Sequence, residues 1–384
     1  MIDQFSEINC NGCQMCKDVC ARNAISYQVN KQGFWFPKVD YSKCIKCGLC
    51  VNKCPNKTKV FNEKTKPLVK AVWSVDDDVR MDSTSGGLFY ELARDILLNK
   101  KGYVVGCIYD DDYKGAHQVI IDSIDELKPL MVSKYVESNA EGIYVKITEA
   151  LKTGKIVLFV GAPCQCAALY SYLGKDYDNL FVVDFLCRGA NSPKAHRKYV
   201  EYLEKKYNSK IVSLRSKDKR NGWERFGQSA VFENGKEYFL PHEEDLRVVA
   251  YHRGNLMVRE SCLDCKFKNL PRYSDITLGD FWGIKPEEVR DIDKGISLCF
   301  INSDKGKLLM EEISNRVESI DKTLDDAKRG NPAIYCSASS SKNRNVFLNS
   351  LDDMQFDKLV NKYKDKSPSL VRRGLRKIKS RLTR

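Results

Sequence analysis

The chain has 384 residues, of which 42% are hydrophobic and 10% aromatic, and these fractions are high enough to exclude a disordered protein. The length predicts two or three domains. A net charge of +13 would suggest nucleic-acid binding, but residues 358–384 hold eleven Lys and Arg against one acid and account for +10 of it. The nearly neutral remainder argues against a nucleic-acid groove, so we expect no nucleic-acid partner.

The chain contains sixteen cysteines, and eight of them fall within the first 54 residues. The N-terminus has neither a basic start nor an apolar run, so it predicts no secretory signal. No segment approaches the ~18 consecutive apolar residues that a membrane span needs. We therefore expect a cytoplasmic chain, in which clustered cysteines indicate metal binding or redox chemistry rather than disulfide bonds.

Two cysteine runs in residues 1–62 share one spacing, in a module too small to be stable without crosslinks or metal. They are Cys10-x2-Cys13-x2-Cys16-x3-Cys20 and Cys44-x2-Cys47-x2-Cys50-x3-Cys54-Pro55. In each run three thiolates can bind one [4Fe–4S] cubane, while the fourth reaches the neighbouring cluster. This duplicated spacing is typical of a bacterial-type ferredoxin. The predicted ligand sets are Cys10, Cys13, Cys16 and Cys54 for one cluster, and Cys44, Cys47, Cys50 and Cys20 for the other.

Two other kinds of metal site account less well for these runs. A pair of four-cysteine zinc sites does not explain why both runs have the same x2-x2-x3 spacing. A radical-SAM cluster needs a CxxxCxxC triad, and neither run supplies its third cysteine. Ala21 stands where the usual pattern has proline. Because proline donates no ligand, this departure leaves the cluster prediction intact and the cluster potential open.

Beyond Pro67, predicted helices and strands alternate. Helices are predicted over 87–100 and 141–152, from about residue 165, and over 193–207; strands are predicted over 103–109, 155–160 and 180–186. Residues 213–241 predict antiparallel hairpins. The fold class expected is α/β with α+β elements: a small ferredoxin-like module followed by a mixed, largely parallel sheet. The expected divisions are 1–62 (ferredoxin-type), 68–150, 151–335 and 358–384 (basic tail).

Four later cysteines lie at expected element ends. Cys164 follows a strand and begins a helix, where amide donors and the helix dipole should lower its thiol pKa. Cys187 ends another strand, so in a parallel sheet both would lie at the carboxyl edge, where ligands bind. Cys262-x2-Cys265 adds a chelating pair, and four thiolates fit a third [4Fe–4S] cluster. Structural cysteines with a labile zinc pair remain the alternative, and Cys166 could replace Cys164.

Five sequence blocks carry a family resemblance. They are DSTSGG (82–87), SKYV (133–136), GAPCQ (161–165), DKRNGW (218–223) and SDITLGDFWG (274–283). Over roughly residues 70–331 the chain thereby resembles the coenzyme F420 hydrogenase/dehydrogenase beta-subunit family, with a fused N-terminal ferredoxin domain. The resemblance implies an FAD-binding iron–sulfur subunit that exchanges electrons with a hydride-accepting or hydride-donating partner. It also implies cluster ligands at Cys164, Cys187, Cys262 and Cys265.

Two of these blocks predict flavin contacts. Hydroxyls and glycines before a helix offer free amides to a flavin phosphate, and an ordinary helix cap is the alternative. We expect a bulky residue at Gly86 to release flavin without unfolding the sheet. Lys134 and Tyr135 could place a cation and a ring against the isoalloxazine, or lie in a solvated loop. The candidate residues are Ser83, Thr84, Ser85, Gly86, Gly87, Ser133, Lys134 and Tyr135. A third block, through Lys219, Arg220, Asn221 and Trp223, could clamp an anionic substrate or merely cover a hairpin.

These features predict an iron–sulfur flavoprotein oxidoreductase with no acid–base or nucleophilic residue at its centre. Electrons would pass from a ferredoxin-like or other donor protein through the clusters to FAD. The acceptor would be a small molecule, coenzyme F420 or another. The alternative is a non-catalytic electron-transfer subunit that feeds a partner enzyme. Family members in anaerobic bacteria, some beside surface-polysaccharide genes, imply that this partner could act in surface-polysaccharide synthesis.

The basic tail carries a separate prediction. From Ser369 onward, apolar residues recur every 3–4 positions among Lys and Arg, as in a helix that lies on an anionic membrane. Gly374 weakens such a helix, and a solvated basic end is the alternative. We expect reversible attachment to the cytoplasmic face of a membrane.

Overall fold

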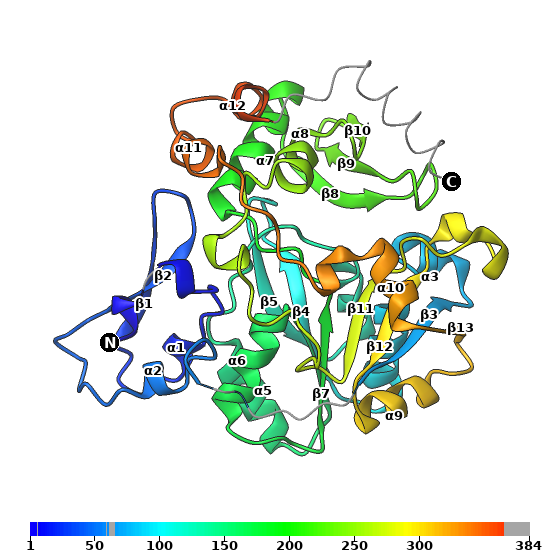
Figure 1. Ribbon diagram of the computed structural model, residues 1–384, viewed down its shortest axis with the longest axis horizontal. Coiled ribbons are helices and arrows are strands. Elements are labelled where there is room, and N and C mark those ends of the chain that lie inside the picture. The colour runs from blue at the N-terminus through cyan, green and yellow to red at the C-terminus, as the bar shows by residue number, and fades with distance from the viewer. Residues whose placement is uncertain (6, 59, 61–65, 365–384) are drawn as a thin grey trace.

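The computed structural model describes residues 1–5, 7–58, 60 and 66–364. Figure 1 shows an N-terminal module at the left, a body built around a large sheet, and a smaller part above that body which contains a second sheet. Within the described ranges, no helix has the length and hydrophobicity that crossing a bilayer requires. The predicted membrane-binding segment at 365–384 lies outside the described residues.

The N-terminal module has two short helices and a hairpin. These are α1 (Met15–Asp18), β1 (Ile25–Val29), β2 (Trp35–Val39) and α2 (Leu49–Asn52), and β1 pairs antiparallel with β2. Ile2, Ile25 and Val39 form the module's own small core around Cys50. Phe34 and Phe36 instead join the core of the upper part of the molecule, so the module is packed onto the body rather than tethered to it.

The large sheet has eight strands in the order β13-β3-β12-β11-β7-β6-β4-β5. The bounds are β3 (Leu68–Ser74), β4 (Tyr103–Tyr109), β5 (Ala116–Ile121), β6 (Val157–Val160), β7 (Leu180–Phe185), β11 (Ile276–Asp280), β12 (Ser297–Ile301) and β13 (Val317–Lys322). The central strands β11, β7, β6 and β4 are parallel to one another, and the flanking pairs are antiparallel. The expected mixed α/β sheet is confirmed, with its parallel strands at the centre. Strands from 68–150 and from 151–335 share this one sheet.

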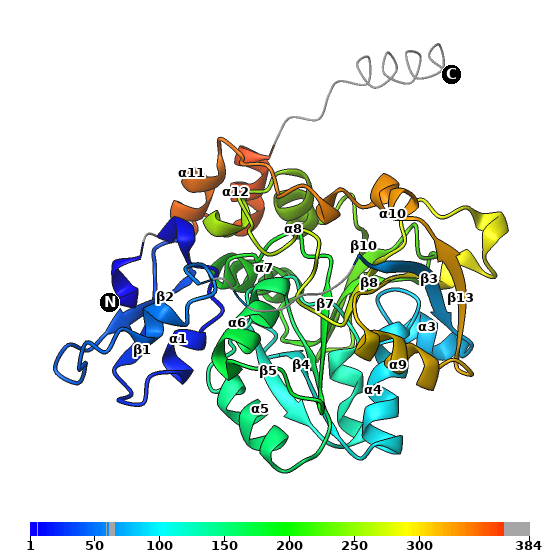
Figure 2. The same cartoon turned by 60° about the horizontal axis from the view of Figure 1, so that its bottom comes forward.

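Helices cover both faces of the sheet. On one face, α5 (Ile143–Lys152) and α6 (Pro163–Leu173) bury their apolar sides against β4, β6 and β7. On the other face lie α4 (Leu88–Arg94), which continues as a π-helical turn, and α9 (Asp304–Glu312). Because both faces are covered, β6 and β7 are almost continuously buried, as parallel strands usually are. Figures 1 and 2 both place α5 and α6 on the side of the body next to α1.

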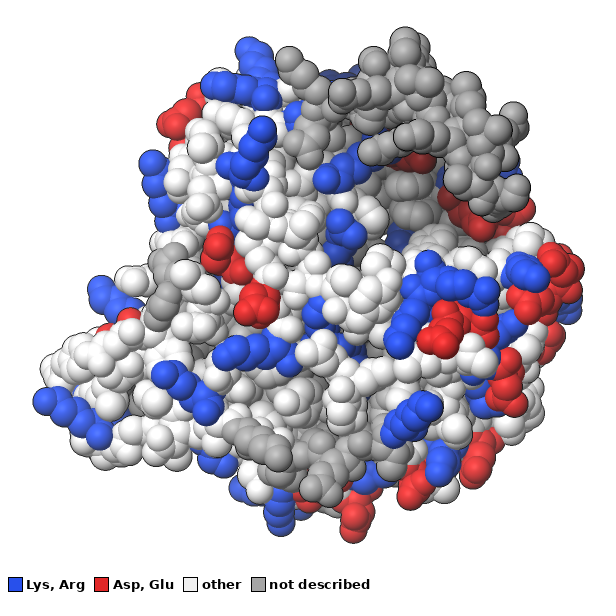
Figure 3. All heavy atoms as spheres, viewed as in Figure 1, with Lys and Arg blue, Asp and Glu red and all other residues white. Residues whose placement is uncertain are grey.

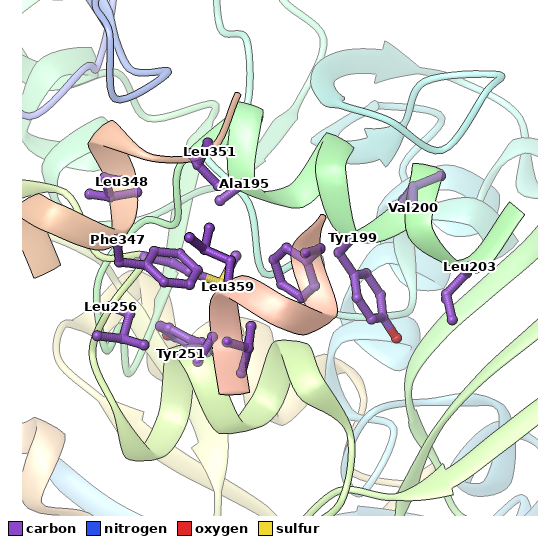
Figure 4. Packing of buried hydrophobic residues seen from close by; sticks show 14 of the residues in the cluster. Ala195, Tyr199, Val200, Leu203, Tyr251, Leu256, Phe347, Leu348, Leu351 and Leu359 are labelled. Atoms are coloured by element: carbon purple, nitrogen blue, oxygen red, sulfur yellow. The ribbon is translucent and has the colours of Figure 1, made fainter. Parts of the chain in front are cut away.

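The upper part is built on a three-stranded antiparallel sheet in the order β10-β9-β8. The strands are β8 (Ile211–Asp218), β9 (Gly227–Phe232) and β10 (Glu237–Pro241), which confirms the hairpin prediction. The helices around it are α7 (Pro193–Tyr207), α8 (Leu246–Val248), α11 (Arg344–Asn349) and α12 (Phe356–Tyr363). In Figure 4, Tyr199 of α7 and Phe347 of α11 lie near Leu359 of α12 in one core. The first residues of the expected basic tail therefore belong to a packed helix.

Two further helices border the large sheet at the end formed by β13 and β3. They are α3 (Asp77–Asp82), which leads into the turn before α4, and α10 (Leu324–Gly330). Asp76 caps α3 by accepting hydrogen bonds from the amides of Asp78 and Val79. This cap fixes where α3 begins, and with it the position of the turn at 83–87.

Candidate functional site

The two N-terminal cysteine runs have the same backbone conformation. Gly12 and Lys46, each two residues after the first cysteine of its run, both have φ in the left-handed region, at 68° and 56°. Gln14 and Gly48, each one residue after the second cysteine, are also left-handed and precede α1 and α2. A non-glycine residue rarely adopts this conformation, so its recurrence at equivalent positions indicates that both loops wrap in the same way.

One group of thiols is drawn from both runs. Burial and then the neighbouring Cys54 and Cys10 raise the pKa of Cys13 to about 12. Burial together with Cys13, Cys10 and Cys54 likewise raises the pKa of Cys16. All four line one cavity of about 100 Å³. The structure thus brings Cys54, from the second run, to the three cysteines of the first, and we name these four residues the inner thiol group.

A second group lies farther out in the module. Burial, with the charge of Cys20 beside it, raises the pKa of Cys50. Burial and the nearby Asp3, Cys44 and Cys50 raise the pKa of Tyr41. Cys47 is exposed on the connecting loop. Cys20, Cys44, Cys47 and Cys50 form the outer thiol group, which corresponds to the other ligand set expected from the spacing.

The four later cysteines converge at the carboxyl edge of the central strands. Burial raises the pKa of Cys187 to about 12, and Cys262 and Cys265 add to the shift. The pKa of Cys164 is also raised, by burial first and then by Cys187, Cys265, Cys13 and Cys262. The expected lowering at the start of α6 is therefore wrong, because desolvation and neighbouring thiols outweigh the helix terminus. We name Cys164, Cys187, Cys262 and Cys265 the third thiol group.

Neighbouring cysteines do not join this group. Cys166 points into the sheet, where its thiol donates to the carbonyl oxygens of Gly161 at 3.7 Å and Val183 at 3.8 Å. It therefore does not replace Cys164. Cys299 is buried in β12, and Cys336 is exposed.

Backbone amides of one loop point at two thiols of the third group. The amide of Gly189 donates to Cys187 Sγ at 3.3 Å, and the amide of Ala190 donates to Cys262 Sγ at 3.4 Å. Such bonds stabilise a thiolate after it loses its proton. Gly189 has φ of 125°, and a Cβ there would lie 2.8 Å from Val258 Cγ1 and 3.1 Å from Cys262 Cβ. Only glycine brings this loop so close to Cys262.

A buried ion pair joins the N-terminal module to the body between the inner and third groups. Arg259 Nη1 donates to both carboxylate oxygens of Glu137 at 2.8 Å, and the two residues are 0% and 4% exposed. The same guanidinium donates to the Cys10 carbonyl at 2.7 Å and the Trp35 carbonyl at 3.0 Å. Neither residue was expected from the sequence, although Arg259 lies three residues before Cys262.

The inner group lies next to the third group. The charge of Cys13 contributes to the raised pKa of Cys164, and Cys13 packs in the same core cluster as Cys164 and Cys265. Tyr144 of α5 donates its hydroxyl to the Cys13 carbonyl at 2.7 Å. On its other side, the inner group adjoins the outer group, since Cys16 and Cys54 pack against the same small core as Cys20, Cys44 and Cys50. The three thiol groups are therefore arranged in series, with the inner group between the other two.

The two segments expected to contact flavin are in contact with each other. Thr84 Oγ1 accepts a hydrogen bond from the Ser133 amide at 2.9 Å and lies 3.2 Å from the Ser133 hydroxyl. Ser85 donates to the Ile296 carbonyl at 2.7 Å. Gly87 has φ of 89° and precedes α4 directly. The turn at 83–87 and the segment at 133–135 thus form one surface.

The amide of Gly86 is not free, since it donates to Ser297 Oγ at 3.0 Å. A Cβ on Gly86 would lie 2.6 Å from the Val72 carbonyl oxygen and 2.7 Å from the Ser297 nitrogen, both backbone atoms of the sheet. A bulky residue at Gly86 would therefore push β3 and β12 apart. The expectation that it would leave the sheet intact is wrong.

Tyr135 connects this surface to the third thiol group. Its ring centroid lies 5.7 Å from that of Tyr251, and the pKa of Tyr251 is raised by burial and by the nearby Cys187. Lys134 donates to the Pro129 carbonyl, and burial lowers its pKa to about 8. A cation and an aromatic ring therefore lie between the turn at 83–87 and the third group.

A cavity of about 730 Å³ opens beside the turn, within the range of about 300–1,000 Å³ usual for small-molecule sites. Figure 3 shows a hollow between the upper part and the body, with Lys and Arg around it. The residues lining the cavity include Met81, Arg220, Asn221, Phe226, His242 and Lys294. Acids also line it, among them Glu224, Glu243 and Asp293, so its charge is mixed.

Three residues of the expected anion clamp already have partners in the protein. Lys219 Nζ donates to the carbonyls of Ser85 at 2.8 Å, Lys294 at 2.7 Å and Arg80. Trp223 is buried, and Arg220 is paired with Asp218 at 2.7 Å. Lys219 therefore holds the turn at 83–87 in place. Of the four residues, Asn221 is the one that is neither buried nor bonded through its side chain within the described part of the chain.

Among the described residues, no group of three or more His, Cys, Asp or Glu side chains has the geometry to hold a single metal ion.

Comparison with known proteins matches two parts of the chain to families. Residues 154–325 match the family described as the C terminus of the coenzyme F420 hydrogenase/dehydrogenase beta subunit, and residues 9–64 match the 4Fe-4S dicluster domain. No curated protein sequence matches the chain. Among solved structures, it is similar to a chain of the xenon-derivatised F420-reducing [NiFe] hydrogenase complex from Methanosarcina barkeri. The two are 16% identical, with a TM-score of 0.48 over 79% of this chain and 93% of that one.

Proposed function

We propose that the chain, whose residues 154–325 match the coenzyme F420 hydrogenase/dehydrogenase beta-subunit family and whose residues 9–64 match the 4Fe–4S dicluster domain, is an iron–sulfur flavoprotein oxidoreductase. A bound FAD would exchange a hydride with a small-molecule substrate. The observation that carries the proposal is the series of three thiol groups leading to the surface formed by residues 83–87 and 133–135.

The chain's own residues would bind the clusters and keep them at fixed positions relative to one another. The inner, outer and third thiol groups would each hold one [4Fe–4S] cluster, which provides one-electron transfer. Gly189 and Ala190 direct amides at thiols of the third group, and hydrogen bonds to cluster sulfurs raise a cluster's potential. The buried Arg259–Glu137 pair keeps the inner group against the third, so that electrons need not cross solvent.

The flavin would lie on the surface between the turn at 83–87 and Tyr135. Thr84 and Ser133 offer hydroxyls to its phosphates, and Lys134 can compensate the negative charge of a reduced flavin. A bound flavin supplies conversion between single electrons and a hydride. The cavity of about 730 Å³ beside this surface would admit the flavin or the acceptor.

A second candidate function is an electron-transfer subunit without flavin that feeds a partner enzyme, such as one of surface-polysaccharide synthesis. The observation that favours it is that two donors of the turn are already hydrogen-bonded. The Gly86 amide donates to Ser297 of β12, and the Ser85 hydroxyl donates to the carbonyl of Ile296, just before β12, so fewer donors remain for a phosphate. For the flavoprotein oxidoreductase, the proposed acceptor is a small molecule that takes a hydride, either coenzyme F420 or another.

The two candidates differ in cofactor content. The full chain, purified without oxygen, is expected to contain about twelve iron atoms, at four per cubane, and one FAD. Dithionite should then reduce the clusters first and the flavin through them. A folded chain loaded with iron that binds no flavin at micromolar concentration would support the electron-transfer subunit instead.

Lys219→Met should weaken flavin binding, because three carbonyls at and near the turn lose their common donor and the turn shifts. We expect the flavin Kd to rise by about 10-fold, corresponding to roughly 1.4 kcal/mol. The iron content should not change. Fluorescence titration of the flavin-depleted protein measures this.

Lys294→Met is the matched control, because Lys294 borders the same cavity while its side chain pairs with Asp77 at 2.5 Å and with Asp291. If Lys219→Met binds flavin as tightly as the wild type, the turn at 83–87 is not part of the flavin site.

We also propose that residues 365–384 attach the protein to an anionic membrane surface, with each Lys or Arg contributing about 1 kcal/mol near the lipid. The full chain should sediment with vesicles containing anionic lipid, and a chain ending at Lys366 should not. Equal sedimentation of both chains would contradict this attachment.

A further inference from the structure

The outer thiol group lies under an exposed apolar surface. Ile45 and Leu49 each lie two residues from the exposed Cys47 in the chain, and Tyr41 lies near Cys44 and Cys50; Tyr41, Ile45 and Leu49 are 49%, 65% and 40% exposed. Ile45 and Leu49 belong to the loop and helix α2 that carry the cysteines, so their position follows directly from the cysteine spacing. A soluble domain seldom exposes neighbouring large apolar side chains without a binding role.

Cations border this apolar surface. Arg22, Lys43 and Lys46 are exposed, and each lies within two residues of a cysteine of the outer group. Residues 1–58 hold eight Lys and Arg against four Asp and Glu. In Figure 3 the module, at the left, presents blue side chains and little red.

The two acids nearest this surface are bound within the module. Asp40 accepts hydrogen bonds from the amide of Ser42 at 3.0 Å and from its hydroxyl at 2.6 Å. Asp3 accepts the hydroxyl hydrogen bond of Tyr41 at 3.0 Å. Asp40 also lies 3.5 Å from Lys43. Both acids are thus engaged within the module, and Lys43, although it lies near Asp40, keeps 62% of its side chain exposed to a partner.

By contrast, no cysteine of the inner and third groups is exposed. Cys10 and Cys262 pack against one core cluster of the body, and Cys13, Cys164 and Cys265 pack against another. Arg259, Glu137 and Tyr144 close the junction between the module and the body. Of the three groups, the outer group alone has a cysteine exposed to solvent among the described residues. A protein that exchanges electrons with this chain by way of the clusters would therefore approach the outer group.

We propose that the surface formed by Tyr41, Ile45 and Leu49, with Arg22, Lys43 and Lys46 at its rim, docks an acidic one-electron carrier protein. This proposal rests on the electron-relay function proposed above. It adds the acidic character of the partner's surface and the outer group as the point at which electrons enter the chain. In the complex, one electron leaves the reduced centre of the carrier and enters the cluster held by the outer group. No bond is formed or broken, and no proton moves.

The size and composition of the surface fit a transient complex. Electron-transfer complexes have small interfaces, often below about 1,200 Å², because the partners must separate after each transfer. An apolar centre excludes water, and rim charges mainly raise the association rate. An acidic carrier would be steered to the basic rim at low salt and released more readily at high salt.

The test compares Lys43→Glu/Lys46→Glu in the full chain with the wild type, both loaded with clusters under anaerobic conditions. The probe is an acidic bacterial 2[4Fe–4S] ferredoxin, with binding measured by calorimetry at 20 and 200 mM salt and cluster reduction by stopped flow. We expect the charge reversal to raise the Kd at least 10-fold at low salt and to abolish most of its salt dependence. Ile45→Ser should raise the Kd with the salt dependence retained.

Lys152→Glu/Lys236→Glu is the matched control, since it makes the same charge change at two exposed positions outside the module. It should bind the ferredoxin as the wild type does, and all variants should retain the wild-type iron content. Basic cytochrome c of similar size, as a second probe, should not bind.

Equal ferredoxin affinity in the charge-reversed variant and the wild type would overturn the proposal. The proposal would also be overturned if Ile45→Ser abolished self-association of the chain or binding to vesicles but left ferredoxin binding unchanged. Dithionite separates this failure from that of the proposed function, because it reduces clusters without docking. If dithionite reduces the clusters and the flavin of every variant, the redox centres are intact, and a change in the ferredoxin result then concerns docking alone.

Discussion

Cys164→Ser is expected to lower the iron content from about twelve to about eight atoms per chain, because a cubane that loses one of four thiolates is not retained. The inner and outer groups share no ligand with the third, so the ferredoxin-type signals should remain. Cys262→Ser should have the same effect. Iron and sulfide analysis of the anaerobically purified chain, with electron paramagnetic resonance after dithionite reduction, measures both.

Cys166→Ser is the control for this experiment. It lies two residues from Cys164 on the same helix, but its thiol bonds to the Gly161 and Val183 carbonyls and does not join the third group. It should keep all of its iron. Unchanged iron content in both Cys164→Ser and Cys262→Ser would contradict the third cluster, and zinc in place of iron would contradict its part in the relay.

Arg259→Met is expected to destabilise the contact between the N-terminal module and the body by about 3–5 kcal/mol. The substitution leaves the carboxylate of Glu137 buried without its cation, and it removes the hydrogen bonds to the Cys10 and Trp35 carbonyls. The module should become more sensitive to proteases, and flavin reduction by way of the outer cluster should slow. Limited proteolysis and urea unfolding measure the first effect.

The double variant Arg259→Met/Glu137→Met tests whether the loss comes from the unpaired charge. Replacing both members of a buried ion pair with apolar residues of similar size is often nearly neutral, so stability should largely return. Since the carbonyls of Cys10 and Trp35 still lack their donor, recovery should be incomplete. If Arg259→Met is as stable as the wild type, the pair does not hold the module in place.

The cysteine spacing by itself predicted two ligand sets among the eight N-terminal cysteines. The x2-x2-x3 pattern leaves a loop few conformations, and both loops adopt the same left-handed turns at Gly12 and Lys46. The fourth cysteine of each run cannot return to its own loop beyond a short helix, which is why Cys54 lies with Cys10, Cys13 and Cys16. Short-range geometry determines this arrangement, and short-range geometry can be read from a sequence.

The elements of the body were predictable for a similar reason. Apolar runs such as 180–186 and amphipathic periods such as 193–207 are local signals, and β7 and α7 follow them closely. The order of the strands was not predictable in this way. β3, the first strand of the body, lies between β12 and β13, which are more than 200 residues later in the chain.

Tertiary structure alone decided which residues act together beyond those patterns. Glu137 and Arg259 are 122 positions apart, and nothing in either local sequence marks them as partners. Lys219, expected at a substrate, instead bonds the carbonyls around Ser85, and the Gly86 amide bonds Ser297. The Cys164 pKa rises where a helix N-terminus predicted a fall, because burial depends on everything packed around the thiol. Desolvation and the pairing of buried charges are properties of the packed molecule, and a sequence does not state which distant groups will surround a side chain.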